Sequence, residues 1–397
     1  MNGRRAYATA LAVMALVAGV GAAAPTPAAP PSFTSAPRPG LRATLSAIPT
    51  PTPTRTPTPT PSPSATQLDG TLQILTYRGY AEYGGVSPKV NWVGSFEKET
   101  GCRIARLDTV QSAEDMAVKV KERAYDVITA GPALAGELIE RKQVQAVDPA
   151  KVSDYEDIDE RFRDMMTVSG KVYGVPYLWG SDEFIYDSAK VRGGGLEQLF
   201  ASGRTVLRDS PMAIAGAALA EGSVKNPYEL SKAELDTAMT LLERNKDRAY
   251  WRNPIDLVQG FATGELDYAQ ATPYYRLLLQ KSGIPVKTLT TRKTTGWVDS
   301  WMLGANVPDT TCAYRWLNWV TDPDAQRDAA AWAGMAPAND KACKGRARLM
   351  CETYGVGDDK RLSRVIFAVR PPGGCRAEDG ECTDYSAWTE RWAELTK

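Results

Sequence analysis

One extended segment near the middle of the chain joins two regions of alternating strand and helix pattern. It runs from Tyr173 to Asp187 and reads YGVPYLWGSDEFIYD. Gly174 and Pro176 disfavour a helix here, and the proline biases the residue before it towards an extended backbone. The apolar and aromatic run that follows is typical of a buried strand. A strand that crosses between two lobes, with rings and carboxylates at the crossing, would build a ligand cleft at a hinge; an ordinary interior strand is the alternative.

The first 24 residues have the pattern of an export signal. Arg4 and Arg5 precede an uncharged stretch of 19 residues, from 6 to 24, with small residues near its end that suit cleavage. That stretch also approaches the length that spans a bilayer. We therefore interpret residues 1–24 as a signal peptide or a signal anchor of an exported protein, which is extracellular or periplasmic. No cysteine lies near the candidate cleavage site, which argues against a lipid anchor.

Residues 25–68 form a linker rich in proline and threonine. Thirteen of the chain's 27 prolines lie there, and proline and threonine alternate strictly from Pro49 to Thr54. Such a sequence cannot bury a core, and it favours the extended polyproline II conformation at about 3.1 Å per residue. We expect a disordered stalk that holds a domain away from a membrane or through a cell wall. An inert low-complexity tail is the alternative.

From position 69 onward the composition is that of one large globular region. Its 329 residues (397 minus 68) exceed what a single core usually supports, so two lobes are expected. The region carries all 47 acidic residues and 42 of the 47 basic ones, a net charge of about −5. Because no basic patch stands out, we expect no nucleic-acid partner.

Strand and helix patterns alternate through this region. Three strand and helix pairs between 71 and 142 predict a parallel sheet, whose carboxyl ends place ligand groups. Residues 297–303 resemble a second crossing between lobes, and the chain ends in an amphipathic helix near 385–395. We expect 69–175 and about 303–338 to form the first lobe, and 176–302 and about 339–397 to form the second. Each lobe is predicted to be a mainly parallel sheet flanked by helices, an α/β fold.

Six cysteines follow the signal, and an even number in an exported chain indicates disulfides. Fifteen pairings are formally possible. Cys343 with Cys351, and Cys375 with Cys382, are close enough in sequence to close two C-terminal loops. Cys102 with Cys312 then follows by elimination.

Catalytic signatures are missing from the sequence. The chain has no histidine, no Gly-x-Ser-x-Gly elbow and no phosphate-binding Gly-x-x-x-x-Gly-Lys motif. Asp182 and Glu183 are adjacent, and neighbouring residues of a strand point to opposite faces, which spoils them as a glycosidase pair. We expect a binding protein without cofactors, with a secreted hydrolase as the minor alternative.

Three segments, in order, resemble those of bacterial extracellular solute-binding proteins. They are residues 173–180, 264–271 and 296–301, supported by 96–101 and 313–326, and the resemblance extends over nearly all of 70–397. The branch most resembled is the spermidine/putrescine-binding proteins of ABC importers. The resemblance implies a two-lobed periplasmic-binding-protein-like fold that closes about hinges on a small solute. It also implies the membrane subunits of an importer as partners of a monomeric receptor.

In that branch a Trp-x-Asp segment at the second crossing places an aromatic face and a carboxylate on a ligand amine. The matching residues here are Trp297 and Asp299; a packing tryptophan and a capping aspartate are the alternative. A ring face attracts a desolvated cation, and a carboxylate fixes its position. The complete set of candidate ligand-binding residues is Trp297, Asp299, Trp179, Asp182, Tyr80, Tyr83, Asp209, Tyr274 and Tyr275.

The chain also departs from that branch. An acidic pair of the family is reduced here to Asp209, and the positions of two first-lobe contacts fall on Gly131 and Ala133. Asp182 and Glu183 add charge beside Trp179. The resemblance therefore implies a cationic, polyamine-like solute without specifying spermidine.

The adjacent Tyr274 and Tyr275 support a second ligand hypothesis. Ferric-ion-binding relatives use neighbouring tyrosines at a similar place, and phenolate oxygens are hard ligands that suit Fe(III). A tyrosine of the other lobe, at position 77, 80 or 83, would complete such a site. A packed aromatic pair is the alternative.

Overall fold

The computed structural model describes residues 70–85, 87–245, 248–307, 311–371 and 382–397. All the described residues belong to one compact unit, 68–397. The predicted signal and stalk lie outside the described residues, so both stay predictions.

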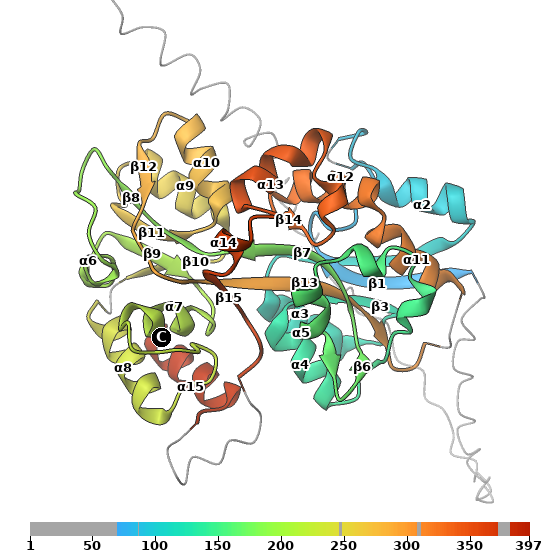
Figure 1. Cartoon of the computed structure of the whole chain (residues 1–397), viewed down its shortest axis with the longest axis horizontal. Helices are drawn as coiled ribbons and strands as arrows, with labels where there is room; N and C mark the ends of the chain where they lie inside the picture. Colours follow the sequence, from blue (N-terminus) through green and yellow to red (C-terminus); the bar gives the residue numbers. More distant parts are fainter. Residues whose placement is uncertain (1–69, 86, 246–247, 308–310, 372–381) are drawn as a thin grey trace, which may run out of the picture. The chain divides into compact units, whose positions relative to one another are not determined.

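The first sheet has eight strands in the order β14-β7-β13-β3-β1-β2, with β15 and β4 paired to the two ends of β13 (Figure 1). β1 is parallel to β2 and β3, whereas β13 is antiparallel to β3 and β7. The strands are β1 (Thr71–Tyr77), β2 (Arg103–Val110), β3 (Val127–Ala130), β4 (Val144–Gln145), β7 (Val175–Ser181), β13 (Thr294–Gly304), β14 (Ala336–Pro337) and β15 (Val365–Phe367).

The second sheet has five strands in the order β10-β9-β11-β8-β12. β9 is parallel to β10 and β11, and β8 is antiparallel to β11 and β12. The strands are β8 (Glu183–Asp187), β9 (Thr205–Arg208), β10 (Ala249–Trp251), β11 (Tyr268–Ala271) and β12 (Val286–Thr288). A separate two-stranded ribbon joins β5 (Thr167–Val168) to β6 (Lys171–Val172).

Both sheets are mixed, which corrects the expectation of mainly parallel sheets. The reason lies in the crossing segments. The expected crossing at 173–187 divides into β7 in the first sheet and β8 in the second, and the return strand β13 lies against β7 in the opposite direction. Every residue of β7 is buried. The detailed assignment of residues to lobes stays a prediction; strand pairing places β7, β13 and β15 in the first sheet.

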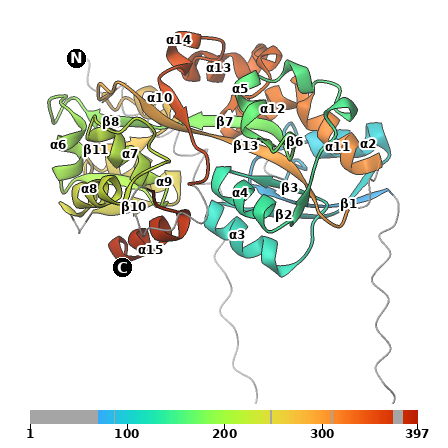
Figure 2. The same ribbon diagram turned by 60° about the horizontal axis from the view of Figure 1, so that its bottom comes forward.

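Helices cover both faces of each sheet (Figure 2). On one face of the first sheet, α3 and α4 bury Met116 and Leu138; on the other, α2, α11 and α12 contribute to a larger core around Phe96 and Trp316. The second sheet is covered by α9 and α10 on one face and by α7, α8 and α15 on the other. Their bounds are α2 (Trp92–Thr100), α3 (Ala113–Glu122), α4 (Pro132–Glu140), α7 (Ala213–Ala220), α8 (Lys232–Glu243), α9 (Pro254–Ala262), α10 (Pro273–Lys281), α11 (Thr311–Thr321), α12 (Pro323–Ala333) and α15 (Tyr385–Leu395). The remaining α-helices are α5 (Glu160–Met165), α6 (Leu196–Ala201), α13 (Arg348–Tyr354) and α14 (Asp359–Leu362).

Local sequence signals set several helix ends. The Ser112 hydroxyl accepts a hydrogen bond from the amide of Asp115 at the start of α3, and Gly101 ends α2 in the left-handed conformation. At α8, Ser231 and Glu234 form a capping box. These interactions satisfy terminal amides and carbonyls that the helix itself cannot pair.

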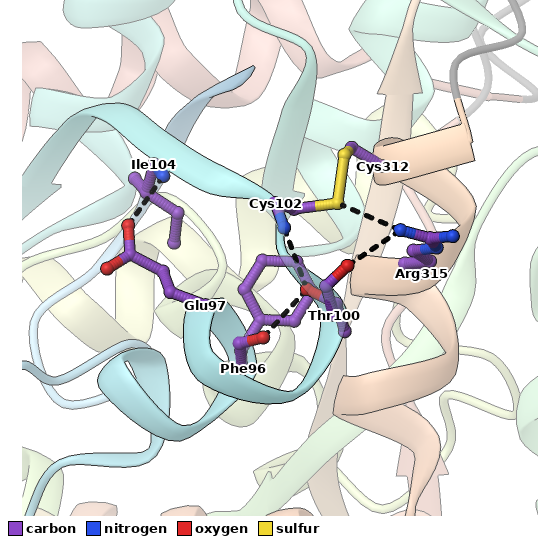
Figure 3. The surroundings of a disulfide bond; sticks show 7 residues. All are labelled: Phe96, Glu97, Thr100, Cys102, Ile104, Cys312 and Arg315. Atoms are coloured by element: carbon purple, nitrogen blue, oxygen red, sulfur yellow. Dashed lines mark hydrogen bonds between the residues drawn. A yellow bond between two sulfur atoms is a disulfide. The ribbon is translucent and has the colours of Figure 1, made fainter. Parts of the chain in front are cut away.

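Two of the three expected disulfides are present among the described residues: Cys102 with Cys312, and Cys343 with Cys351. The first links the start of β2 to α11 (Figure 3). Nearby, Arg315 donates from Nη1 to the carbonyl oxygen of Thr100 at 2.7 Å. Cys382 is disulfide-bonded, whereas Cys375, its expected partner, lies outside the described residues.

Candidate functional site

The crossing strand β13 carries the two residues of the Trp-x-Asp segment. Because side chains alternate along a strand, Trp297 and Asp299 project from one face of β13. Val298 projects from the other face into the larger core around Phe96 and Trp316. Asp299 is only 5% exposed, and Trp297 is half-buried and packs against the core of the second sheet. Both side chains therefore lie where the two sheets adjoin.

Asp299 is surrounded by groups from the carboxyl ends of β1 and β3. The Tyr80 hydroxyl donates to its Oδ2 at 2.5 Å, and the indole of Trp297, two residues before it on the same strand, lies beside it. A Cβ at Gly131 would lie 3.0 Å from Oδ1, so only glycine allows this close approach of the backbone without a shift. The ring of Tyr80 packs edge-on against Tyr77, with centroids 5.4 Å apart. This arrangement agrees with the rule that parallel sheets place functional groups at their carboxyl ends.

Burial raises the pKa of Asp299 to about 6, although the hydrogen bonds from Tyr80 and Trp297 and the charge of Arg208 act in the opposite direction. Burial and the neighbouring Asp299 charge also raise the pKa of Tyr80 and of Tyr77. Both tyrosines are therefore neutral, and Tyr80 donates its hydroxyl proton to a carboxylate that is mostly ionised at neutral pH. Burial removes the water that would otherwise solvate this carboxylate. A ligand cation can therefore bind to it in place of that water.

The ring of Trp297 lies directly on the backbone of β7. Trp297 is paired with Gly180 across the two strands, and a Cβ at Gly180 would be 2.5 Å from the indole Cζ2 atom. Gly180 therefore makes room for the flat indole. The Arg208 guanidinium lies over this ring, with its Cζ 4.3 Å from the ring centroid.

Arg208 ends β9, and so brings a positive charge from the second sheet. Its Nη2 lies 3.6 Å from Oδ1 of Asp182. Asp182 is 7% exposed, and its Oδ2 accepts a hydrogen bond from the Thr295 hydroxyl at 2.7 Å. The structure thus brings together four of the expected site residues, namely Tyr80, Asp299, Trp297 and Asp182. They lie near Arg208, which the sequence analysis missed. The short strand before Asp209 was the available signal, because residues that end parallel strands are candidates for ligand contact.

Trp179 lies in the core, which corrects its inclusion in the expected site, whereas Tyr83 has its contacts on α2 and stays a prediction. Trp179 is 1% exposed and packs in the core against Phe162 and Tyr354, with its N–H bonded to the carbonyl of Pro337. It has no free face for a ligand. Tyr83 is 42% exposed, and its hydroxyl donates to a carboxylate of α2, 3.1 Å away.

Asp209 is already engaged by its neighbours. Its Oδ2 accepts from Nε of Arg252 at 2.6 Å, and its Oδ1 accepts from the indole of Trp392 at 2.9 Å. Both carboxylate oxygens therefore serve to attach α15 and the loop after β10. We retain Asp209 as a structural residue beside Arg208, and not as a ligand contact.

The tandem tyrosines form a packed aromatic pair. Their ring centroids are 5.4 Å apart, and Tyr274 lies against Gly334, where a Cβ would be 2.4 Å from its ring. Tyr275 packs edge-on against Trp251, and burial raises its pKa to about 12. Because iron binding needs phenolate, this environment opposes the ferric hypothesis. Within the described residues there is also no group of three or more acidic or cysteine side chains that could hold a metal ion.

A hollow of about 750 Å³ lies on another part of the surface, beside α13. The Cys343–Cys351 disulfide and the charged side chains of Arg348, Glu352 and Arg361 line it. It has no aromatic wall and no deeply buried charge. The Asp299 cluster has both, and we therefore place the candidate ligand site there.

Two mixed sheets, each covered by helices and joined by crossing strands, form the two-lobed fold of solute-binding proteins. Residues 91–345 match the family of bacterial extracellular solute-binding proteins. The chain belongs to this family, whose members bind solutes and are not enzymes. The hydrolase alternative therefore has no support.

Two curated relatives show how far the similarity extends. Over 102 residues, the chain is 34% identical to the putrescine/agmatine-binding protein of Pseudomonas aeruginosa; the match covers 25% of this chain and 28% of that protein. Over 261 residues it is 22% identical to the spermidine/putrescine-binding periplasmic protein of Salmonella typhimurium, covering 62% and 72% of the two chains.

A solved structure extends the likeness over the whole fold. It is the spermidine/putrescine ABC transporter substrate-binding protein from Streptococcus pneumoniae, with a TM-score of 0.60 and 15% identity. The match covers 82% of this chain and 99% of that one. Family members are extracellular or periplasmic proteins. Among the described residues, no helix has the length and apolar character needed to cross a membrane.

Proposed function

We propose that this protein is the receptor of an ABC importer and binds a small solute with an ammonium group between its two lobes. The observation that carries the proposal is Asp299, a buried carboxylate that accepts a hydrogen bond from Tyr80. A buried carboxylate is costly unless a cation or donors compensate it. A ligand ammonium would complete this compensation.

Closure of the lobes follows from the origin of the contacts. Asp299 and Tyr80 belong to the first sheet and its loops, whereas Arg208 comes from the second sheet. A ligand that touches both groups favours the closed form by its extra affinity for that form. The membrane subunits of the importer would then recognise the closed receptor. The names of the relatives, which include putrescine, agmatine and spermidine, support an amine as the ligand.

A thermal-shift screen of the full chain tests this function. The panel contains diamines and polyamines, quaternary amines, amino acids, sugars and Fe(III). We expect at least one compound with a primary ammonium group to raise the melting temperature in a concentration-dependent manner, because binding to the folded state alone stabilises it. Stabilisation by sugars or Fe(III) only, with no response to any amine, would contradict the proposal.

A further inference from the structure

The Arg208 guanidinium, at the end of β9, lies over two indole rings. Its Cζ lies 4.3 Å from the ring centroid of Trp297 and 5.2 Å from that of Trp251. The carboxylate that pairs with it among the described residues, Asp182, is 3.6 Å away, beyond hydrogen-bond distance. Asp182 Oδ1 itself has no hydrogen-bond partner in the described part of the chain, although it is buried. Stacking thus holds the plane of the guanidinium while its N–H edge is left without an acceptor among these residues.

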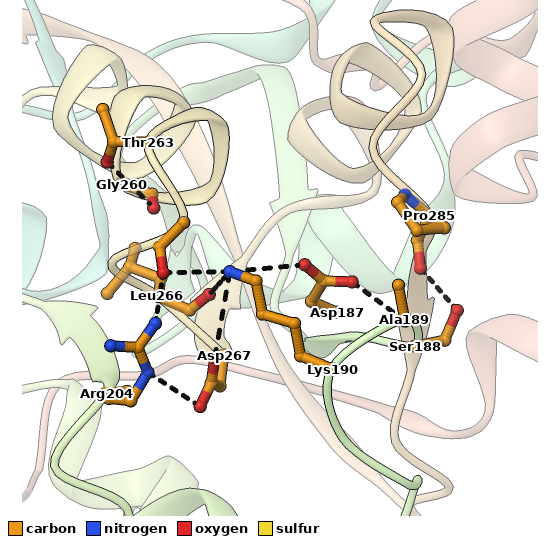
Figure 4. Close-up of polar contacts among 11 residues, drawn as sticks. Asp187, Ser188, Ala189, Lys190, Arg204, Gly260, Thr263, Leu266, Asp267 and Pro285 are labelled. Carbon is orange, nitrogen blue, oxygen red and sulfur yellow. Dashed lines mark hydrogen bonds and ion pairs between the residues drawn. The ribbon is translucent and has the colours of Figure 1, made fainter.

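A second arginine beside the same strand provides an internal comparison. Arg204 immediately precedes β9, and its Nε donates to Asp267 Oδ2 at 2.9 Å (Figure 4). Its Nη2 donates to the carbonyl oxygen of Gly264. The donors of Arg204 are therefore used to join loops of the second sheet, whereas the side chain of Arg208 makes no comparable hydrogen bond to a described residue.

Opposite charges flank the single indole of Trp297. Asp299 lies beside it on the same face of β13, and the ring face of Trp297 supports Arg208. The face expected to receive a ligand cation is therefore covered by the protein's own cation. A second ammonium group of a diamine placed there would be repelled by Arg208, because like charges at short range are unfavourable. A carboxylate placed there would instead meet a planar fork of N–H donors.

We propose that the site selects a small amino acid over a diamine, with the ligand's ammonium group on Asp299 and its carboxylate on the N–H edge of Arg208. This rests on the proposed function, since Asp299 has the same role in both. Trp297 and Trp251 hold the guanidinium plane for a bidentate contact. Asp182 holds the arginine charge in place and partly balances it before the ligand arrives.

Isothermal titration calorimetry of the full chain with matched ligands tests the selection. One series consists of ω-amino acids of two to six carbons, a second of the diamines with the same carbon chains, and a third of the standard α-amino acids. We expect the best amino acid to bind at least about 10-fold more tightly than the best diamine, which corresponds to roughly 1.4 kcal/mol. A diamine that equals or exceeds every amino acid would overturn this inference and leave the proposed function standing. If no compound of any series binds to folded protein, this inference is wrong; the proposed function is then also wrong only if no polyamine or other amine stabilises the protein in the thermal-shift screen.

A pair of variants then assigns the effect to one side chain. Arg208→Gln should weaken amino-acid binding about 30-fold or more and improve the relative affinity of the matched diamine. Arg204→Gln is the control, because it removes the same charge beside the same strand; it should leave both affinities unchanged. Melting curves of the unliganded variants verify folding. Equal losses in the two variants, or an unchanged preference in Arg208→Gln, would contradict the role of Arg208.

Discussion

Two tryptophans on neighbouring strands have very different surroundings. Trp179 of β7 pairs with Val298, and Trp297 of β13 pairs with Gly180. The indole of Trp179 is enclosed by other rings and is 1% exposed, whereas that of Trp297 is half-buried and lies on bare backbone beneath Arg208. The comparison teaches that the face from which a tryptophan projects, and the groups packed on that face, decide whether the ring belongs to the core or to a site.

The largest effect is expected from removing each indole in turn. Trp179→Ala should lower the free energy of unfolding by about 3–5 kcal/mol, because a fully buried ring leaves a cavity. Trp297→Ala should cost less stability and chiefly weaken ligand binding. Urea denaturation and calorimetry measure the two quantities. A Trp179→Ala variant as stable as the wild type would remove the basis of the comparison.

Neutralising the carboxylate beside Trp297 is expected to have the next largest effect. Asp299→Asn should weaken binding of an amine ligand about 30- to 100-fold, because a hydrogen bond to a charged group contributes about 1.5–3 kcal/mol. Its unliganded form should be at least as stable as the wild type above pH 6. In the folded state the pKa of Asp299 is raised to about 6, so the fold disfavours the ionised carboxylate, which the asparagine variant does not carry. Calorimetric titration beside a melting curve checks both; undiminished binding would exclude Asp299 from the site.

The same raised pKa predicts a pH dependence of ligand binding. Below pH 6 Asp299 takes up a proton, and the affinity for an ammonium ligand should fall by up to about tenfold per pH unit. The effect of pH on the stability of the unliganded protein has the opposite sign. The folded carboxyl binds a proton more tightly than the unfolded one, so its contribution to stability decreases as pH rises from about 4 to about 6. Titrations between pH 5 and 8 test this, with Asp299→Asn expected to remove the dependence.

The smallest effect concerns the bare backbone under Trp297. In Gly180→Ala the new methyl group would meet the indole at 2.5 Å and displace it from its position beneath Arg208. We expect a 3- to 10-fold loss of ligand affinity and a destabilisation of about 1–3 kcal/mol from overpacking. Gly203→Ala is a matched control, since the nearest atom to its added Cβ is 3.8 Å away. If both variants behave alike, the fit between Gly180 and Trp297 does not matter for binding.

Much of the fold could be predicted because its signals are local. Ser112 and Gly101 mark helix ends by their own hydrogen-bonding and backbone preferences, and the alternation of strand and helix predicts an α/β fold. Of segment 264–271, which carries part of the family resemblance, only Tyr268–Ala271 is a strand, because Gly264 adopts a positive φ in a preceding turn. The order of strands in a sheet depends on distant pairings, so its mixed character was missed.

The candidate site was only partly predictable for the same reason. Trp297 and Asp299 are two residues apart on one strand, so a motif can identify them together. Arg208 meets Trp297 only because β9 and β13, 89 positions apart by these residues (297 minus 208), are brought together by tertiary packing. Likewise, nothing local to Trp179 shows that Phe162 and Tyr354 will enclose it.

The Cys102–Cys312 link makes most of the molecule a covalent ring. Its two ends are 210 positions apart, and every strand of the second sheet lies between them. One peptide-bond cleavage anywhere inside the ring would open it without releasing a fragment. In an exported receptor exposed to extracellular proteases, both lobes would thus stay attached to each other after a first peptide-bond cleavage.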